Sequence, residues 1–205
     1  CYNPITVVME ILVEDKTAPV AVCDQHTVVG ITYDGYADVY AQTFDDGSYD
    51  DCWLDSMAVR RMDANATVCD PGNEEFRPFV TFCCEDITGA SPPMIVLRVW
   101  DEFNNYNDCM VEVEVQDKLA PSISCPPNLT ISCDYHLDRE DLSDFGTVVT
   151  DKAQQSHLAI APPYLIDNDD LLYDGLAHDN CTFTIEEDTL FDISQCNVGL
   201  IERTF

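Results

Sequence analysis

Basic residues are scarce in this sequence: Lys and Arg together number 9, against 39 Asp and Glu, which leaves a formal net charge of −30. So acidic a chain repels phosphate backbones and anionic lipid head groups, which argues against nucleic-acid binding and electrostatic membrane attachment. Long apolar runs are also missing, because no uninterrupted stretch approaches the ~20 residues of a membrane-spanning helix. We therefore expect no nucleic-acid partner and no membrane insertion.

Signatures of catalysis are lacking as well. The four histidines lie apart, without the spacing of a metalloprotease or a Cys-His metal motif. There is no Gly-x-Ser-x-Gly elbow, no phosphate-binding glycine loop and no dinucleotide fingerprint. Carboxylates are so numerous that no single pair indicates glycoside hydrolysis. The sequence predicts a protein that is not an enzyme.

Cysteine, by contrast, is abundant, with 11 residues. They lack the paired Cys-x-x-Cys spacing of a zinc ribbon and are too many to remain free thiols. We therefore expect disulfides and an oxidising, extracellular location, either at a cell surface or secreted. Because the sequence begins with Cys1, without Met or a signal peptide, we also expect an interior or processed segment of a longer exported chain.

A repeat is found by comparing the sequence with itself. The segment 13–23 matches 115–125, and Asp117 lies 102 residues after Asp15. Two further matches join 50–52 to 179–181 and 97–100 to 202–205. A fixed period of this length indicates tandem structural units.

Within one period the pattern is that of β-strands. Val111, Val113 and Val115 alternate with glutamates, which is the period of a strand with one face in water. Further strand candidates are 37–41, 79–82 and 94–100, and no stretch shows an amphipathic helix of three turns. Roughly seven short strands in ~100 residues are typical of a β-sandwich. The sequence therefore predicts an all-β fold of tandem sandwiches.

The repeat divides the chain unevenly. Residues 1–14 correspond to the last strand of a preceding repeat, 15–116 form one complete unit, and 117–205 form a second unit with inserted loops and without its final strand. A sandwich that lacks a strand exposes an edge that invites pairing. The expected partners are neighbouring repeats of the same protein or, by donation of residues 1–14 as a complementing strand, other copies. No surface or glycan target is indicated.

These segments resemble a known family. The residues 15–23, 48–52, 99–109, 125–128 and 179–181 are similar to hyalin-type (HYR) repeats and to the related Ig-like repeats of giant bacterial surface adhesins, notably the gliding-motility adhesins exported by the type IX secretion system. The resemblance covers nearly the whole chain and implies Ig-like sandwiches, a cell-surface location and an adhesive or filament-forming role. The sequence departs from the family pattern at 104–107 and at the additional pair Cys83-Cys84.

Acidic side chains gather at one end of the expected sandwich. In an Ig-like topology the entry of the first strand, the loop between the second and third strands and the loop between the last two strands lie at the same end. Flexible Asp and Asn side chains there suit Ca²⁺, so we expect calcium at the junctions between units, with solvated turn residues as the alternative. The candidate ligands are Asp15, Asp45, Asp46, Asp50, Asp51, Asp101, Asn104 and Asn107 at one junction and Asp117, Asp174 and Asp179 at the next.

Disulfide connectivity stays open at this point, since six cysteines allow about fifteen pairings. The expected topology places Cys52 and Cys109 at one end, which makes them the preferred pair. Cys23 and Cys69 then each take a partner from the vicinal pair Cys83-Cys84. The alternatives for this pair are a disulfide between Cys83 and Cys84 themselves, or a metal site formed by their thiolates. Candidate glycosylation sites are Ser56 and Thr189 in Asp-Ser/Thr-apolar sequences and Asn65 and Asn128 in Asn-x-Thr sequons.

Together these features predict a non-catalytic structural segment of an extracellular repeat protein. Calcium at the unit junctions would stiffen an adhesin stalk or surface fibre, and disulfides would resist unfolding. The alternatives are a ligand-recognition module for glycan or protein, or an accessory region of a secreted enzyme.

Overall fold

The computed structural model describes residues 4–62, 66–71, 75–89, 91–155, 174–194 and 198–205. Strands predominate in this part of the chain, and helical structure is limited to the four-residue α1 (Ala66–Cys69) and three short 3₁₀ turns. The predicted all-β class is confirmed. The chain forms two compact units, Cys1–Lys118 (unit 1) and Leu119–Phe205 (unit 2). Among the described residues, no helix has the length and apolarity needed to span a membrane.

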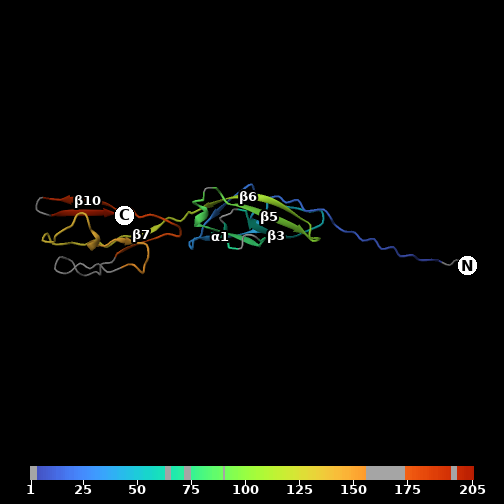
Figure 1. Ribbon diagram of the computed structural model, residues 1–205, viewed down its shortest axis with the longest axis horizontal. Coiled ribbons are helices and arrows are strands. Elements are labelled where there is room, and N and C mark those ends of the chain that lie inside the picture. The colour runs from blue at the N-terminus through green and yellow to red at the C-terminus, as the bar shows by residue number, and fades with distance from the viewer. Residues whose placement is uncertain (1–3, 63–65, 72–74, 90, 156–173, 195–197) are drawn as a thin grey trace. The chain divides into compact units, whose positions relative to one another are not determined.

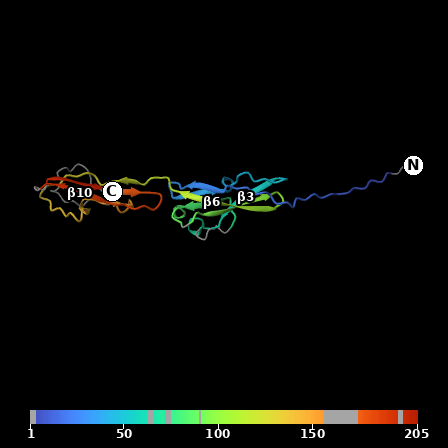
Figure 2. The ribbon, with the colours of Figure 1, turned by 90° about the horizontal axis from the view of Figure 1, so that it is seen from above.

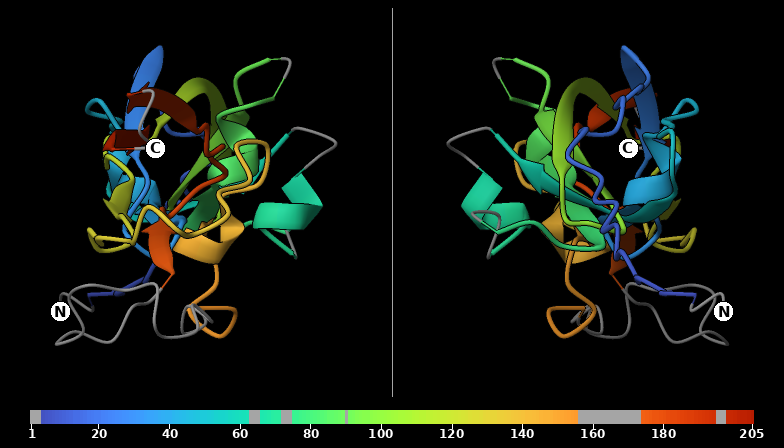
Figure 3. Two further views of the ribbon diagram at one scale, coloured as in Figure 1. Left: turned by 90° about the vertical axis from the view of Figure 1, so that its left-hand side faces the viewer. Right: turned by 90° about the vertical axis from the view of Figure 1, so that its right-hand side faces the viewer.

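Unit 1 contains two sheets (Figures 1 and 2). The larger has the order β1-β6-β5-β3, with β1 parallel to β6 and the other pairs antiparallel. The smaller pairs β2 with β4 in antiparallel fashion. Their bounds are β1 (His26–Gly30), β2 (Tyr36–Tyr40), β3 (Leu54–Arg61), β4 (Phe79–Cys83), β5 (Met94–Asp101) and β6 (Tyr106–Gln116). Figure 3 shows α1 at the periphery of the unit.

The core of unit 1 lies between these sheets. On β6, Val111 and Val113 are fully buried while the intervening Glu112 is exposed, as the alternation predicts. The other strands contribute in the same way, and the fully buried members are Val59 on β3, Val80 and Phe82 on β4, and Ile95, Leu97 and Val99 on β5. Because both sheets supply these side chains, burial of the apolar faces joins the sheets into one body.

Unit 2 contains a three-stranded sheet and a hairpin. The sheet has the order β7-β9-β8, with β7 antiparallel and β8 parallel to β9. The hairpin joins β10 to β11 in antiparallel fashion. Their bounds are β7 (Ser122–Ser124), β8 (Val148–Val149), β9 (Gly175–His178), β10 (Asp188–Ile193) and β11 (Gly199–Thr204). A Cβ atom at Gly175 would lie 2.4 Å from the backbone oxygen of Ser124, so glycine permits this close strand contact.

Candidate cation site

Three segments that are distant in the sequence meet at one end of unit 1. They are the segment before β1, the loop between β2 and β3, and the turn between β5 and β6. The first two are joined by backbone hydrogen bonds between Val20 and Tyr49, at 2.8 and 3.1 Å. The first and third are joined because Asn105 Nδ2 donates to the backbone oxygen of Asp15 at 3.4 Å. The acidic segments are therefore neighbours in the fold.

Asp101, at the end of β5, organises the turn between β5 and β6. It is 1% exposed, and its Oδ1 accepts hydrogen bonds from the backbone N–H groups of Phe103 and Asn105, both at 2.8 Å. Its Oδ2 accepts from Asn105 Nδ2, also at 2.8 Å. Asn104 adopts a φ of 63°, in the left-handed region that asparagine tolerates. Both oxygens of Asp101 are thus engaged within the turn.

Asp15, Asp50 and Cys52 form a tighter cluster, with one ligand atom of each residue within 4.8 Å of the others. Asp15 Oδ1 accepts from the backbone N–H of Thr17 at 2.8 Å, and this bond holds the pKa of Asp15 below its ordinary value. Asp50 Oδ2 accepts from the backbone N–H of Cys52 at 2.9 Å. Asp15 Oδ2 is buried and has no hydrogen-bond partner within the described part of the chain. Carboxylate oxygens suit a hard cation such as Ca²⁺, whereas the thiol suits a softer metal.

The other ligands predicted for this junction lie outside the cluster. Asp45 accepts from the backbone N–H groups of Gly47 and Ser48, at 3.3 and 3.0 Å, and so closes its own turn. Asn107 Nδ2 donates to the backbone oxygen of Pro19 at 3.1 Å, which ties β6 to the entry segment. The remaining three, Asp46, Asp51 and Asn104, are exposed.

The ligands predicted for the next junction are divided between the units. Asp117 belongs to unit 1, and Asp174 and Asp179 belong to unit 2. Asp174 is 8% exposed, and its Oδ1 accepts from the backbone N–H of Thr147 at 3.0 Å, so it supports a loop within unit 2. Calcium at that junction stays a prediction.

The disulfides correct the preferred pairing of Cys52 with Cys109. Cys109 is bonded to Cys23, with 6.2 Å between their Cα atoms, and Cys52 is an exposed free thiol. The prediction was wrong because a strand rises about 3.3 Å per residue. Cys109 lies along β6, away from the turn, and faces the segment that leads into β1, the strand beside β6. Cys52 remains at the end of the unit, beside Asp15.

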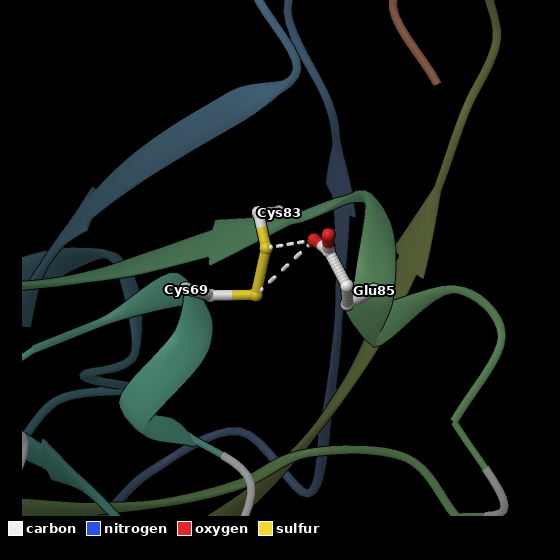
Figure 4. Close-up of side chains that lie close together, drawn as sticks. All are labelled: Cys69, Cys83 and Glu85. Carbon is white, nitrogen blue, oxygen red and sulfur yellow. Dashed lines mark hydrogen bonds between the residues drawn. A yellow bond between two sulfur atoms is a disulfide. The ribbon is translucent and has the colours of Figure 1, made fainter. Parts of the chain in front are cut away.

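Figure 4 shows the second disulfide, between Cys69 and Cys83, with Glu85 beside it. This bond agrees with the expectation that Cys69 takes a partner from the vicinal pair Cys83-Cys84. The same expectation for Cys23 was wrong, because Cys23 is bonded to Cys109. Glu85 Oε2 lies 2.6 Å from Cys83 Sγ and 3.9 Å from Cys69 Sγ. Because the two sulfurs are bonded to each other, they do not act here as thiolate metal ligands. Cys84 and Cys181 are not free thiols either, and the disulfides fit an oxidising, extracellular-type environment.

The candidate glycosylation residues are distributed over both units. Ser56 is exposed on β3, and Asn128 is exposed in unit 2. Thr189 is partly exposed on β10, where its hydroxyl donates to Glu187 at 3.4 Å. Asn65 lies outside the described residues. Modification of these residues stays a prediction.

Two participants of the site were missed by sequence reasoning. Asn105 connects the backbone of Asp15 to the carboxylate of Asp101, and Cys52 is a free thiol beside Asp15. The sequence did contain a signal for Asn105. An Asp followed four residues later by an Asn, directly after a strand, is a pattern that favours a closed turn. Comparison with known proteins adds no assignment: no family model, curated protein or solved structure matches the chain.

The reactivity of Cys52 offers a test of this local geometry. The adjacent Asp15 carboxylate, followed by burial, raises the pKa of the Cys52 thiol. Since the thiolate is the nucleophile, Asp15→Asn is expected to lower this pKa and to speed alkylation by iodoacetamide at about pH 8 by roughly threefold to tenfold. Site-resolved mass spectrometry measures the rate, with the free thiols Cys125 and Cys133 of unit 2 as internal controls. An unchanged rate at Cys52 would contradict the contact.

Proposed function

We propose that this chain is a non-catalytic structural segment of an extracellular repeat protein, in which Ca²⁺ bound at the end of Ig-like units stiffens an adhesin stalk or surface fibre. The observation that carries the proposal is the cluster of Asp15 and Asp50, where a buried carboxylate oxygen lacks a hydrogen-bond partner among the described residues. The chain has a net charge of −30. A divalent cation would satisfy that oxygen and reduce the repulsion between carboxylates.

The Ig-like assignment of unit 1 is supported by its strand order. In β1-β6-β5-β3, the last strand lies between the first strand and the next-to-last strand. The trio β6-β5-β3 corresponds to the G, F and C strands of an Ig-like sheet, and β2-β4 corresponds to B and E of the facing sheet. On this assignment the acidic loops between β2 and β3 and between β5 and β6 are the B–C and F–G loops.

A related pairing in unit 2 supports the tandem arrangement. Val20 pairs with Tyr49 in unit 1, and Ser122 pairs with His178 in unit 2, both antiparallel. Ser122 lies 102 residues after Val20, and Tyr49 and His178 each lie three residues before a cysteine of the matching acidic segments. Equivalent positions of the repeat thus make equivalent backbone contacts, as expected for two copies of one kind of unit.

The mechanical role of the cation follows from which segments it would join. Asp15 precedes β1, and Asp50 lies in the loop between β2 and β3. Ca²⁺ prefers about six to eight oxygen ligands, so these two carboxylates would be the protein anchors, with backbone carbonyls and water completing the shell. The bound ion would fix the chain where it enters unit 1, and a fixed entry transmits force along a row of units without bending.

Thermal unfolding with and without Ca²⁺ tests the proposal. A cation that binds only the folded state stabilises it by about 2.7 kcal/mol at 100 times its Kd, so the Tm of unit 1 is expected to rise by roughly 8–13 °C. Indole fluorescence reports unit 1 alone, because the two tryptophans of the chain, Trp53 and Trp100, both lie there.

The control variants separate ligation from general charge neutralisation. Asp15→Asn combined with Asp50→Asn is expected to abolish the Ca²⁺-dependent rise in Tm. Asp192→Asn, which removes an exposed carboxylate from β10, is expected to retain it. NaCl at matched ionic strength measures the effect of screening. A Tm that Ca²⁺ does not change, or a Ca²⁺-dependent rise in Tm that remains in the double variant, would refute the site.

A further inference from the structure

The segment 4–14 exposes apolar side chains that have no partner in the described part of the chain. Ile5 and Val13 are 88% and 84% exposed, and no described strand pairs with the segment. Figure 1 shows this segment, in blue, extending away from the strands of unit 1. Every odd position is apolar: Ile5, Val7, Met9, Ile11 and Val13. A period of two with one fully apolar face is the pattern of a β-strand that covers a core.

The sequence repeat relates this segment to β6. The offset of 102 residues that joins Asp15 to Asp117 places Tyr106–Gln116, the whole of β6, opposite residues 4–14. In β6 the residues Val111 and Val113 are fully buried, and the offset places them opposite Met9 and Ile11. The segment therefore has the side-chain pattern of the strand that closes a sandwich. In unit 1 that place is already held by β6.

In unit 2, β11 presents an edge that suits such a strand. Among the described residues, β10 is the only neighbour of β11. The counterpart of β11 in unit 1 is β5, because residues 97–100 match residues 202–205, and β5 lies between β3 and β6. Ser194 N–H donates to Val198 O at 3.0 Å, at the end of the hairpin where β10 is connected to β11. Because inter-strand bonds alternate along an antiparallel ladder, the backbone groups of Ile201 and Arg203 are directed away from β10. Within the described part of the chain they have no strand partner, and such an edge is a template for a further strand.

We propose that residues 4–14 of one copy add to the β11 edge of a second copy, taking beside β11 the place that β6 takes beside β5. The backbone groups of Ile201 and Arg203 would then be hydrogen-bonded, and the odd-numbered side chains of the donor would cover the face on which Phe191 and Ile201 are half-exposed. The occupant is assigned from the match between residues 4–14 and β6. The inference goes beyond the proposed function and does not require a cation.

Sedimentation of the complete 205-residue chain in EDTA, at about 1–200 μM, tests the pairing. The mass is expected to rise with concentration. Ile11→Asp places a charge on the apolar face of the donor and is expected to weaken association by about tenfold or more. Leu12→Asp, which adds the same charge to the opposite face of the strand, is the matched control and should associate nearly as the parent chain does. Neither change disturbs a folded unit, because residues 4–14 are exposed.

Hydrogen exchange locates the acceptor in the same samples. The amide protons of Ile201 and Arg203 are expected to exchange at least about tenfold more slowly at high than at low protein concentration. A chain that remains monomeric, an association that Ile11→Asp and Leu12→Asp weaken equally, or an association without protection of β11 would each overturn the proposal. Protection of β11 in a monomer would also overturn it, because the donor would then belong to the same copy. Since EDTA is present throughout, failure here is distinct from failure of the calcium proposal.

Discussion

Replacing Asp86 with alanine is expected to lower the free energy of unfolding of unit 1 by about 3–5 kcal/mol. Asp86 accepts two hydrogen bonds from the guanidinium of Arg61, at 2.6 and 3.0 Å, and the two side chains are 8% and 0% exposed. Without the carboxylate, the buried Arg61 guanidinium would lose both of these charge-assisted hydrogen bonds. Such a loss exceeds what a surface ion pair contributes, because water cannot replace the missing partner.

The position of the pair explains why its effect extends to the whole unit. Arg61 ends β3 of the larger sheet, and Asp86 follows β4 of the smaller sheet. The guanidinium also donates to the backbone oxygen of Thr81 at 3.0 Å and lies 5.1 Å from the ring centroid of Phe82. The planar fork of arginine makes all these contacts at once, so Arg61→Lys is expected to fail as a conservative change.

Urea unfolding followed by tryptophan fluorescence measures this loss in unit 1. The matched control is Asp108→Ala, which removes the partner of Arg98 in a bond of similar geometry, at 2.6 and 2.7 Å. Those side chains are 36% and 22% exposed, and solvent screens the charge that remains, so the control is expected to lose about 1 kcal/mol or less. Equal losses in the two variants would contradict the argument from burial.

Four strands of unit 1, β2, β4, β5 and β6, were predicted from the sequence, whereas β1 and β3 were not singled out. The alternation of valine and glutamate in β6 reflects burial with a period of two, and the apolar runs of β4 and β5 reflect strands that are buried on both faces over part of their length. Both patterns are local properties of the strand. Residues 4–14 carry no strand pairing within the described part of the chain, so the assignment of residues 1–14 as the last strand of a preceding repeat, or as a donor strand, stays a prediction. A segment forms a strand only when a neighbouring strand accepts its hydrogen bonds. The local sequence pattern does not show whether such a neighbour is present.

The site was predictable as a region but not as a set of ligands. Asp15, Asp45 and Asp101 were equivalent candidates in the sequence, yet Asp45 and Asp101 use both carboxylate oxygens on backbone or side-chain N–H groups of their own turns. Asp15 alone of the three keeps a buried oxygen without a hydrogen bond among the described residues. Asp is favoured both for closing turns and for binding cations, so composition cannot separate the two uses.

Breaking the bond between Cys23 and Cys109 is expected to lower the free energy of unfolding of unit 1 by about 4–5 kcal/mol. The two residues are 86 positions apart, and a cross-link across so long a loop removes a large conformational entropy from the unfolded chain. The double variant Cys23→Ala with Cys109→Ala avoids leaving a reactive thiol. Urea unfolding followed by indole fluorescence measures the change.

The control for this prediction is Cys52→Ala, because the sequence favoured Cys52 as the partner of Cys109. Cys52 is exposed and unpaired, so its loss is expected to change stability by no more than about 0.5 kcal/mol. The bond from Cys23 fastens the segment before β1 to β6, and the candidate cation site lies at the start of that same segment. If Cys52→Ala were as destabilising as the double variant, Cys52 would be bonded to Cys109. The thiol would then be absent from its place beside Asp15, and the geometry inferred for the cation site would fail with it.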